Sequence, residues 1–254
     1  MIGCVVHAFE SVMSTQELAA ALAREGAPTG TVVTARHQTG GRGRRGRSWW
    51  DAPGQSLLLS VVLRPPGPVA QAPQLSLVAA LAVTDALATA ATLRASIRWP
   101  NDVLVDGRKI CGILPEAASG SGDAVGHVIL GLGINVNQTA FPAALATRAT
   151  SIRLLTGRLH ELVPLRRVVL DALDRRYERW LAGGFAALRE ECRQRSSTLG
   201  ERVRGDGGVE GRAVDIAEDG ALLVDTGAGA PARVVSVPAD DAESGEVEHD
   251  AARH

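Results

Sequence analysis

The chain has 254 residues, of which 45% are hydrophobic and 22% are charged, and its formal net charge at neutral pH is −1. This size and apolar content allow one large domain with a core and a second, smaller one. The near-zero net charge argues against general binding to nucleic acid or to an anionic membrane.

Cysteine and histidine usage favours a reduced compartment and argues against a zinc site. The three cysteines are scattered, and the six histidines show no ligand spacing with them. The N-terminus has no basic region or cleavage site typical of a signal peptide, and no apolar run approaches 18 residues. We therefore expect a cytoplasmic protein that does not span a membrane.

The first part of the chain alternates short apolar or β-branched runs with two helical patterns. The predicted strands are 3–9, 31–36, 56–63, 103–105, 109–114 and 127–135, residues 97–99 lead into 100–102, and the predicted helices are 14–24 and 71–92. Ser14 provides a helix N-cap, and the helix at 71–92 is apolar around much of its girth and is expected to be buried. Asp106-Gly107 predicts a tight hairpin that turns Lys109 back toward Asn101 and Asp102.

The second part of the chain changes character twice. Residues 142–157 are loop-like, 164–180 and 185–195 are typical of amphipathic helices, and short strands are predicted at 202–203, 209–215, 221–225 and 233–237. Residues 240–254 contain six acids and one arginine, which predicts a disordered tail. The expected division is therefore a main domain at 1–197, a small β module at 198–238 and an acidic tail at 239–254.

An arginine loop at residues 41–47 reads Gly-Arg-Gly-Arg-Arg-Gly-Arg and precedes Trp49 and Trp50. Glycines leave backbone N–H groups accessible, and arginines offer planar charged forks to phosphate or carboxylate. The string matches the dinucleotide fingerprint, but no helix follows it and no acid ends a strand about 20 residues later. From the residue types alone, an anion-binding loop and a solvated basic loop or nucleic-acid patch both remain open.

The chain has a strong bias among its basic residues. Of 27 basic residues, 26 are arginine and one is Lys109. Such an exception points to a position where a compact ammonium is needed and a planar guanidinium does not fit. The alternative is that Lys109 is an incidental surface residue.

Several motifs in register resemble those of the biotin protein ligases. The family's G-R-G-R-x-G-R-x-W appears at 41–49, its K-W-P-N-D at 98–102, its R-K-x-x-G-I-L at 108–114 with Glu116 following, and its G-x-G-I-N at 131–135. The resemblance extends from about residue 9 to residue 237. It implies an α+β fold in which a mixed sheet with flanking helices, of the class II synthetase-like biotin–lipoyl ligase type, is followed by a small SH3-like β-barrel.

The resemblance implies a two-step reaction. Members of the family activate biotin with ATP to biotinyl-5′-AMP and pyrophosphate, and then transfer biotin to one lysine of a carboxyl carrier domain of acetyl-CoA, acyl-CoA or pyruvate carboxylase. Because the first step brings two anions together, it needs clustered positive charge and Mg²⁺. We expect ATP to hold most of the Mg²⁺ coordination, with Asp102 as a candidate protein ligand.

The resemblance also assigns site residues. It implies catalytic roles for Lys109, Asp102 and Arg47. It implies contacts to biotin from Ser14, Thr15, Gln16, Gln38, Gly41, Arg42, Gly43, Arg44, Lys109 and Gly112. It implies contacts to ATP from Arg44, Arg47, Trp49, Asn101, Asp102, Lys109 and Asn135.

The chain departs from the family pattern at three positions. Gln16 stands where the family usually has Asn, Arg98 where it has Lys, and Gly40 where it has Ala. A ligand role for Gln16 and a catalytic role for Arg98 are therefore in question. Few residues precede Ser14, so we expect a ligase without the winged helix-turn-helix that some members carry. A monomer and a homodimer both remain open, and the arginine loop is expected to be mobile without ligand.

Two other functions fit parts of the sequence. Lipoate or octanoyl ligases resemble the same fold and also use a lysine, and a comparison of lipoate with biotin as substrate would distinguish them. A non-catalytic nucleic-acid-binding protein could use the arginine loop, but its affinity would fall steeply with salt and would not depend on biotin.

Overall fold

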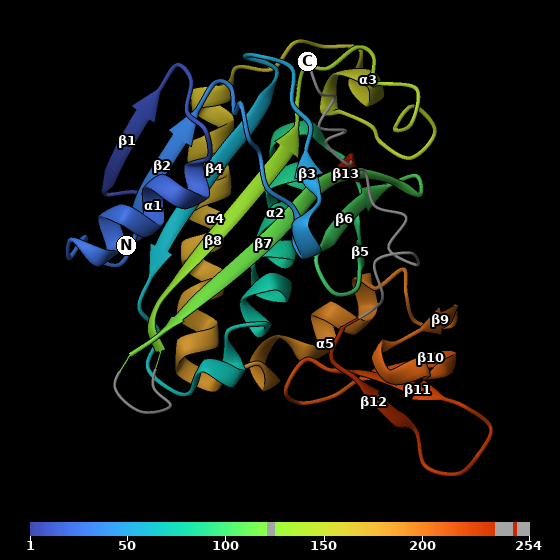
Figure 1. Ribbon diagram of the computed structural model, residues 1–254. Helices are drawn as coiled ribbons and strands as arrows, with labels where there is room; N and C mark the ends of the chain where they lie inside the picture. Colours follow the sequence, from blue (N-terminus) through green and yellow to red (C-terminus); the bar gives the residue numbers. More distant parts are fainter. Residues whose placement is uncertain (121–124, 237–245, 248–254) are drawn as a thin grey trace, which may run out of the picture.

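A seven-stranded mixed sheet forms the centre of the molecule (Figure 1). The computed structural model describes residues 1–120, 125–236 and 246–247. The strand order is β1-β2-β4-β8-β7-β6-β5, and only β1 and β2 run parallel among these pairs. The strands are β1 (Val5–Phe9), β2 (Thr31–Ala35), β4 (Ser56–Leu63), β5 (Ser96–Arg98), β6 (Asp102–Val105), β7 (Arg108–Ser119) and β8 (Val125–Asn135).

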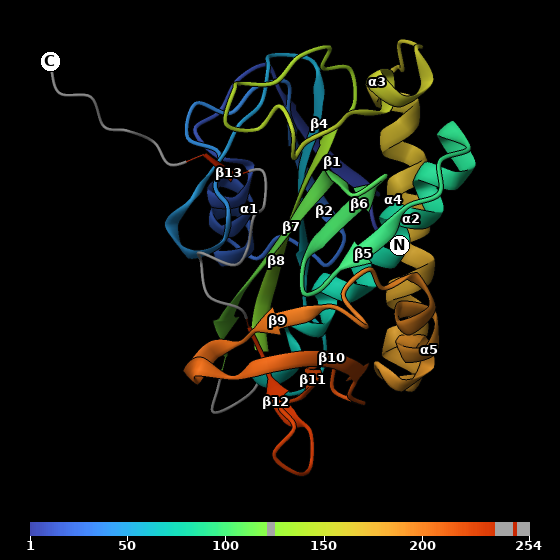
Figure 2. The same ribbon diagram turned by 90° about the vertical axis from the view of Figure 1, so that its right-hand side faces the viewer.

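Helices cover both faces of this sheet, which explains why the central strand β4 is buried along its whole length. Helix α1 (Thr15–Arg24) lies on one face, while α2 (Gln74–Ala91) and α4 (Leu162–Gly183) lie side by side on the other (Figure 2). The main core joins α2 and α4 to the sheet, and a smaller core packs α1 onto β2, β4 and β8. The predicted mixed sheet with flanking helices is confirmed.

The helix α2 is buried on nearly all sides, as its apolar girth predicts. Residues 69–91, which include the preceding 3₁₀ turn, contain an 18-residue window with the length and the mean hydropathy, 1.5, of a membrane-spanning helix. The expectation that no apolar stretch reaches that length was therefore wrong. Of that window, 72% is buried inside the protein, as expected for a helix in a protein core.

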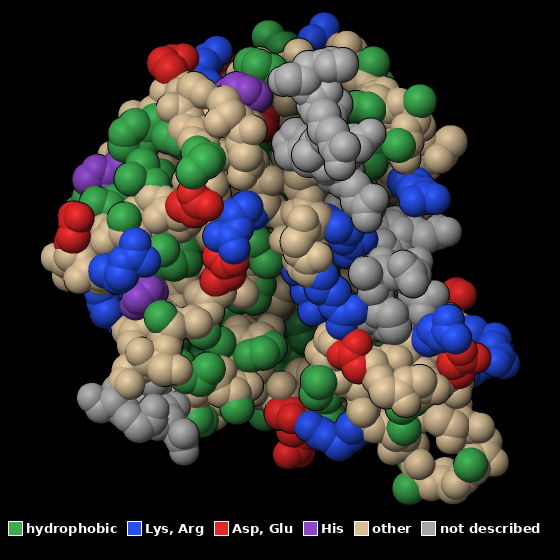
Figure 3. Space-filling view, viewed as in Figure 1, with side chains coloured by type: hydrophobic (Ala, Val, Ile, Leu, Met, Phe, Trp, Pro, Cys, Tyr) green, Lys and Arg blue, Asp and Glu red, His purple; other side chains and the backbone are tan. Residues whose placement is uncertain are grey.

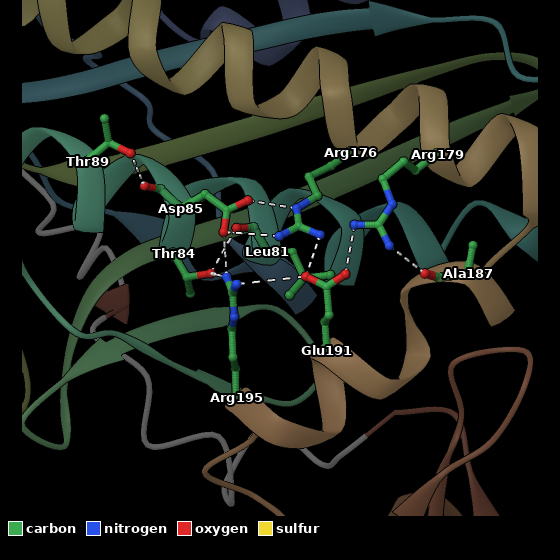
Figure 4. Close-up of polar contacts among 9 residues, drawn as sticks. All are labelled: Leu81, Thr84, Asp85, Thr89, Arg176, Arg179, Ala187, Glu191 and Arg195. Atoms are coloured by element: carbon green, nitrogen blue, oxygen red, sulfur yellow. Dashed lines mark hydrogen bonds and ion pairs between the residues drawn. The ribbon is translucent and has the colours of Figure 1, made fainter.

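An ionic cluster ties α2 and α4 to helix α5 (Ala186–Arg195) (Figure 4). We define this cluster as Asp85, Arg176, Arg179, Glu191 and Arg195. The Arg176 guanidinium donates to Asp85 Oδ2 at 2.7 Å and to Glu191 Oε2 at 2.6 Å, and Arg195 donates to Asp85 Oδ1 at 2.7 Å. Burial alone raises the pKa of Asp85, but the hydrogen bonds and charges of Arg176 and Arg195 outweigh burial and lower it.

A small antiparallel sheet follows α5, with the strand order β12-β11-β10-β9. Its strands are β9 (Arg202–Arg204), β10 (Glu210–Ile216), β11 (Leu222–Asp225) and β12 (Ala232–Val234). The predicted SH3-like module is confirmed as this four-stranded sheet, in which the described strands do not close into a barrel. Trp99 Nε1 donates to Gly220 O at 2.9 Å, and Arg189 pairs with Asp215 at 2.7 Å, so the module is docked on the main domain.

Three local features complete the comparison with prediction. The hairpin between β6 and β7 turns at Asp106 and Gly107, with φ values of 50° and 73°, as predicted for this pair.

A short helix, α3 (Ile152–Thr156), lies in the stretch expected to be loop; it is capped by Ser151, whose side chain accepts from Leu154 N–H. The expected acidic tail falls outside the described residues, except that β13 (Glu246–Val247) pairs with β3 (Ser48–Trp49).

Candidate active site

A pocket of about 420 Å³ opens between α1, the sheet and the arginine loop. We call its hydrogen-bonded group of Thr15, Gln16, Gln38 and Ser60 the polar wall. The remaining lining comes mainly from α1's N-cap, the arginine loop, and the glycine-rich parts of β7 and β8. These other lining residues are Ser14, Arg42, Gly43, Trp49, Leu59, Gly112, Ile113, Leu114, Gly131, Leu132 and Gly133.

Hydrogen bonds connect the polar wall from end to end. Gln38 Oε1 accepts from the Thr15 N–H at 2.8 Å and from the Thr15 hydroxyl at 2.9 Å. Thr15 Oγ1 lies 2.9 Å from Ser60 Oγ, and Ser60 donates to Gln16 Oε1 at 3.0 Å. Gln16 Nε2 donates to Leu114 O at 3.0 Å and to Ile129 O at 3.1 Å. Both polar atoms of Gln16 therefore hold α1 against the sheet.

Ser14 has the predicted role at the start of α1. Its side chain accepts from the Gln16 N–H at 3.2 Å, and the residue is 3% exposed. Since the hydroxyl accepts in this cap, its hydrogen remains available as a donor to the pocket that Ser14 lines.

Glycines leave the floor of the pocket flat enough for the indole of Trp49. A Cβ added at Gly133 would lie 2.5 Å from Trp49 Cε2, and one added at Gly112 would lie 2.8 Å from Trp49 Cζ3. A Cβ at Gly131 would lie 2.5 Å from Gln16 Oε1. Any side chain at these positions would displace the indole or the amide, which explains the spacing of glycines along β7 and β8.

Lys109 lies beside this floor and is only 2% exposed. Its Nζ is 2.9 Å from Asp102 Oδ1 and 5.5 Å from the centroid of the Trp49 ring. The alternative of an incidental surface lysine is therefore excluded. The β6–β7 hairpin places Lys109 next to Asp102, and the Lys109 N–H donates to Arg148 O at 2.7 Å, which anchors the backbone on its other side.

A second pocket of about 210 Å³ lies on the other side of Trp49. It is lined by Trp49, Trp50, Lys109, Asn135, Phe141, Leu145 and Ala149. The Trp50 and Phe141 rings are 5.6 Å apart and tilted by 57°. Trp49 borders both pockets, and Lys109 lines the second while its Nζ would lie 3.2 Å from a Cβ on Gly112 of the first. The Lys109 ammonium therefore lies where the pockets meet.

The arginine loop is held by contacts to distant elements. Arg42 pairs with Glu116 of β7 at 2.7 Å, Arg44 donates to Asn101 Oδ1 at 3.0 Å, and Arg45 pairs with Asp206 at 2.8 Å. A group of Lys and Arg side chains accordingly lies in the middle of the face shown in Figure 3. The premise that the loop has little to pack against without ligand was wrong, because acids on β7 and in the C-terminal module already contact it.

The two ends of the loop region are joined by His37 and Asp51. His37 Nδ1 lies 2.9 Å from Asp51 Oδ2, and Asp51 Oδ1 accepts from the Gln38 N–H at 3.3 Å. Burial raises the pKa of Asp51, and the hydrogen bond and charge of His37 only partly offset this. This contact fixes Gln38 of the polar wall relative to the tryptophans.

Family models match two parts of the chain. Residues 8–135 match the biotin/lipoate A/B protein ligase family, and residues 198–249 match the biotin protein ligase C-terminal domain. The chain belongs to the biotin protein ligase family.

Relatives of this ligase extend over most of the chain. It is 40% identical to the biotin–[acetyl-CoA-carboxylase] ligase of Paracoccus denitrificans, over 76% of this chain and 82% of that protein. It is 37% identical to the bifunctional ligase/repressor BirA of Bacillus spizizenii, over 85% of this chain and 67% of that protein. The structure of the Aquifex aeolicus biotin protein ligase in complex with biotin and ATP superposes with a TM-score of 0.80, at 30% identity, and covers 92% of this chain and 97% of that one.

The structure of this ligase brings most of the predicted residues to the two pockets, and it adds Ser60. Gly41 lies against Gln38 and Trp49, while Asn101 and Asp102 reach the site through Arg44 and Lys109. Arg98 is exposed and lines neither pocket. Ser60 escaped the sequence analysis because a single small polar residue in an apolar run gives no local sign of a site; in the structure it is 0% exposed.

Proposed function

We propose that this biotin protein ligase uses the larger pocket for biotin and the smaller, aromatic pocket for the adenosine part of ATP. The observation that carries the proposal is the position of Lys109, a buried ammonium where the two pockets meet. A carboxylate in one pocket and an α-phosphate in the other would both approach this cation. The polar wall suits a ring that carries amide-like groups, since such a ring is selected strongly only when its polar atoms are paired.

In the first step, a biotin carboxylate oxygen forms a bond to the α-phosphorus, the bond from that phosphorus to the bridging oxygen breaks, and pyrophosphate leaves. Lys109 stabilises the charge that accumulates on the reacting oxygens, and Asp102, 2.9 Å away, orients its ammonium. Arg44 and Arg47 extend the positive charge toward the phosphates. In the second step, a lysine amine of the acceptor attacks the acyl carbon, loses a proton and displaces AMP.

Mg²⁺ fits this site only with help from the substrate. The described residues contain no group of three or more His, Cys, Asp or Glu side chains that could hold a metal. Asp102 offers one carboxylate beside Lys109. Mg²⁺ in phosphoryl-transfer enzymes often uses one or two carboxylates plus substrate phosphates, which suits this donor set. Asp102 would hold the ion with ATP, and Mg²⁺ would neutralise phosphate charge there.

The acceptor is proposed to be the biotin carboxyl carrier domain of a carboxylase, as the name of the Paracoccus denitrificans relative suggests. We assign catalysis to residues 1–197 and an accessory role to residues 198–238, a division supported by the two family matches. A cytoplasmic location remains part of the same proposal. The sequence leaves both a monomer and a homodimer open.

The decisive experiment is biotin-dependent exchange of labelled pyrophosphate into ATP. Replacing the compact ammonium in Lys109→Arg should lower exchange about 100- to 1,000-fold, as loss of a preorganised charge contact does elsewhere. Arg108→Lys, on the same hairpin, is the matched control and should keep activity within about threefold of the wild type, since neither pocket includes Arg108. If pyrophosphate exchange survived in Lys109→Arg, Lys109 would have no essential role in the adenylation step.

The family description also includes lipoate ligases, so lipoate is the second candidate substrate. Exchange supported by lipoate but not by biotin would replace the proposed substrate and leave the adenylation chemistry intact.

A further inference from the structure

The oxygens of the polar wall outnumber the hydrogens that are directed at them. The four oxygens are Thr15 Oγ1, Ser60 Oγ, Gln16 Oε1 and Gln38 Oε1, linked by contacts of 3.0 Å or less. Among the described residues, the hydrogens directed at them are the Thr15 N–H, the Thr15 hydroxyl and the Ser60 hydroxyl. At least one oxygen in this buried group therefore accepts no hydrogen bond.

The backbone fixes the orientation of both amides, so the shortage cannot be relieved by rotating them. Gln16 must point Nε2 at Leu114 O and Ile129 O, because a carbonyl oxygen only accepts. Gln38 must point Oε1 at the Thr15 N–H, which only donates. Both amide oxygens consequently face the two hydroxyl groups.

The Ser60 hydrogen has two possible acceptors, Gln16 Oε1 at 3.0 Å and Thr15 Oγ1 at 2.9 Å. Without Ser60, the Gln16 oxygen has no donor among the described residues, and leaving a buried amide oxygen unpaired is costly. Gln38 Oε1, by contrast, already accepts from a backbone N–H. The shortage therefore falls on Thr15 Oγ1, which lines the pocket.

We infer that Gln16 determines ring specificity by drawing the Ser60 hydrogen away from Thr15, which leaves Thr15 Oγ1 as an acceptor for an N–H of the ligand. Ser14 lies beside it with a hydroxyl that can donate to a ligand carbonyl. Together they match the N–H and C=O of a cyclic urea. This inference rests on the proposed function: the ring of biotin carries N–H groups, whereas the dithiolane of lipoate carries none. Gln16 is thus a positioning residue rather than a ligand contact.

The test compares the Kd of biotin with those of two analogues in which one ring N–H at a time is replaced by CH₂. Calorimetry on the full chain gives the ratio of analogue Kd to biotin Kd. Each analogue gives one Kd ratio. In the wild type, the larger of the two ratios should be about 10- to 100-fold, the loss expected for a buried acceptor left unpaired. In Gln16→Met, the Ser60 hydroxyl can turn to Thr15, so the ratio should fall to about threefold or less.

The double variant Ser60→Ala/Gln16→Met separates this effect from simple damage. It removes the hydroxyl that could supply Thr15, so the ratio should return toward the wild-type value although biotin binds more weakly. Ser60→Ala alone should also keep the wild-type ratio, which provides a reading even if Gln16→Met does not fold.

Each outcome bears on the inference. Three results would overturn the inference while the wild type still bound biotin. They are a Kd ratio that is unchanged in Gln16→Met, a Kd ratio that stays low in the double variant, and a Kd ratio that collapses in Ser60→Ala. A wild type that does not bind biotin would overturn the proposed function as well.

Discussion

The ionic cluster and the arginine loop both use arginine–carboxylate pairs, but they differ in connectivity and support. In the cluster, Arg176 contacts Asp85 and Glu191 together, and each acid has a second arginine. All of these side chains project from helices that pack on one another. In the loop, Arg42 and Arg45 each pair with an acid on a separate distant element.

This difference suits two tasks. Charges that are shared several ways between packed helices cannot be replaced by a ligand without disturbing the core. Single pairs with partly exposed side chains, such as Arg42–Glu116 at 44% and 35% exposure, contribute about 1 kcal/mol or less and can give way to an incoming anion. The same residue type therefore stabilises the fold in one region and, under the proposed function, remains available to substrate in the other.

The largest effect on stability is expected from Arg176→Met. This change leaves Glu191 and Asp85 with fewer partners at a site where the guanidinium is only 9% exposed, so the free energy of unfolding should fall by about 2–4 kcal/mol. Urea denaturation measures this directly. Arg179→Met removes an arginine of the same cluster that is 48% exposed, and should cost less than about 1 kcal/mol. Equal losses would mean that burial does not distinguish the two arginines.

The opposite pattern is expected from Arg44→Met in the arginine loop. Biotin-dependent pyrophosphate exchange should fall about 10- to 100-fold, since charge near the reacting phosphate is lost, while the free energy of unfolding changes by less than about 0.5 kcal/mol. Arg175→Met, on the exposed side of α4, is the matched control and should change neither quantity. A destabilisation as large as that of Arg176→Met would remove the distinction between the two regions.

A smaller effect is expected in how the stability contributed by each region depends on pH. The pKa values of Asp85 and Glu191 are lowered, because their arginine partners outweigh the opposing effect of burial. The ionised acids therefore stabilise the folded state above the unfolded-state pKa values of about 4, and this contribution is lost as the pH falls through the folded-state values. The difference in unfolding free energy between the wild type and Arg176→Met should be constant from pH 7 to 5 and shrink below about pH 4.

Asp51, at the base of the loop region, should respond with the opposite sign. Burial raises its pKa, so the folded state holds the proton more tightly than the unfolded state does. Relative to Asp51→Asn, the wild type should gain stability as the pH falls through the raised pKa. If the stability differences for Arg176→Met and Asp51→Asn changed with pH in the same direction, the opposite pKa shifts assigned to the two regions would be contradicted.

Local sequence signals predicted the elements that form without distant partners. Ser14 was predictable as a cap, and Asp106-Gly107 as a hairpin turn, because the side chain and the backbone conformation decide these features locally. The isolation of Lys109 among arginines indicated a position that needs a compact ammonium, but its burial became known only from the structure. The site motifs were recognised from their resemblance to the family pattern, and the structure adds that Gly112 and Gly133 lie against the Trp49 indole.

Features that depend on tertiary contact were beyond the sequence. Arg45 and Asp206 are separated by 161 residues, and no local pattern links them. Ser60 resembled any small residue in an apolar strand until α1 was placed over it. The helix α3 has only five residues, too few to show a helical period. The sequence also could not reveal that both polar atoms of Gln16 are already occupied.

The single lysine of the chain has a chemical consequence. A ligase that forms an acyl-adenylate generates an electrophile that reacts with any accessible amine. Here the sole lysine is 2% exposed and its ammonium is paired with Asp102 inside the proposed active site, so no lysine side chain lies on the described surface. Arginine supplies positive charge while staying inert to acylation, so the described surface carries positive charge without lysine amines that an acyl-adenylate could modify.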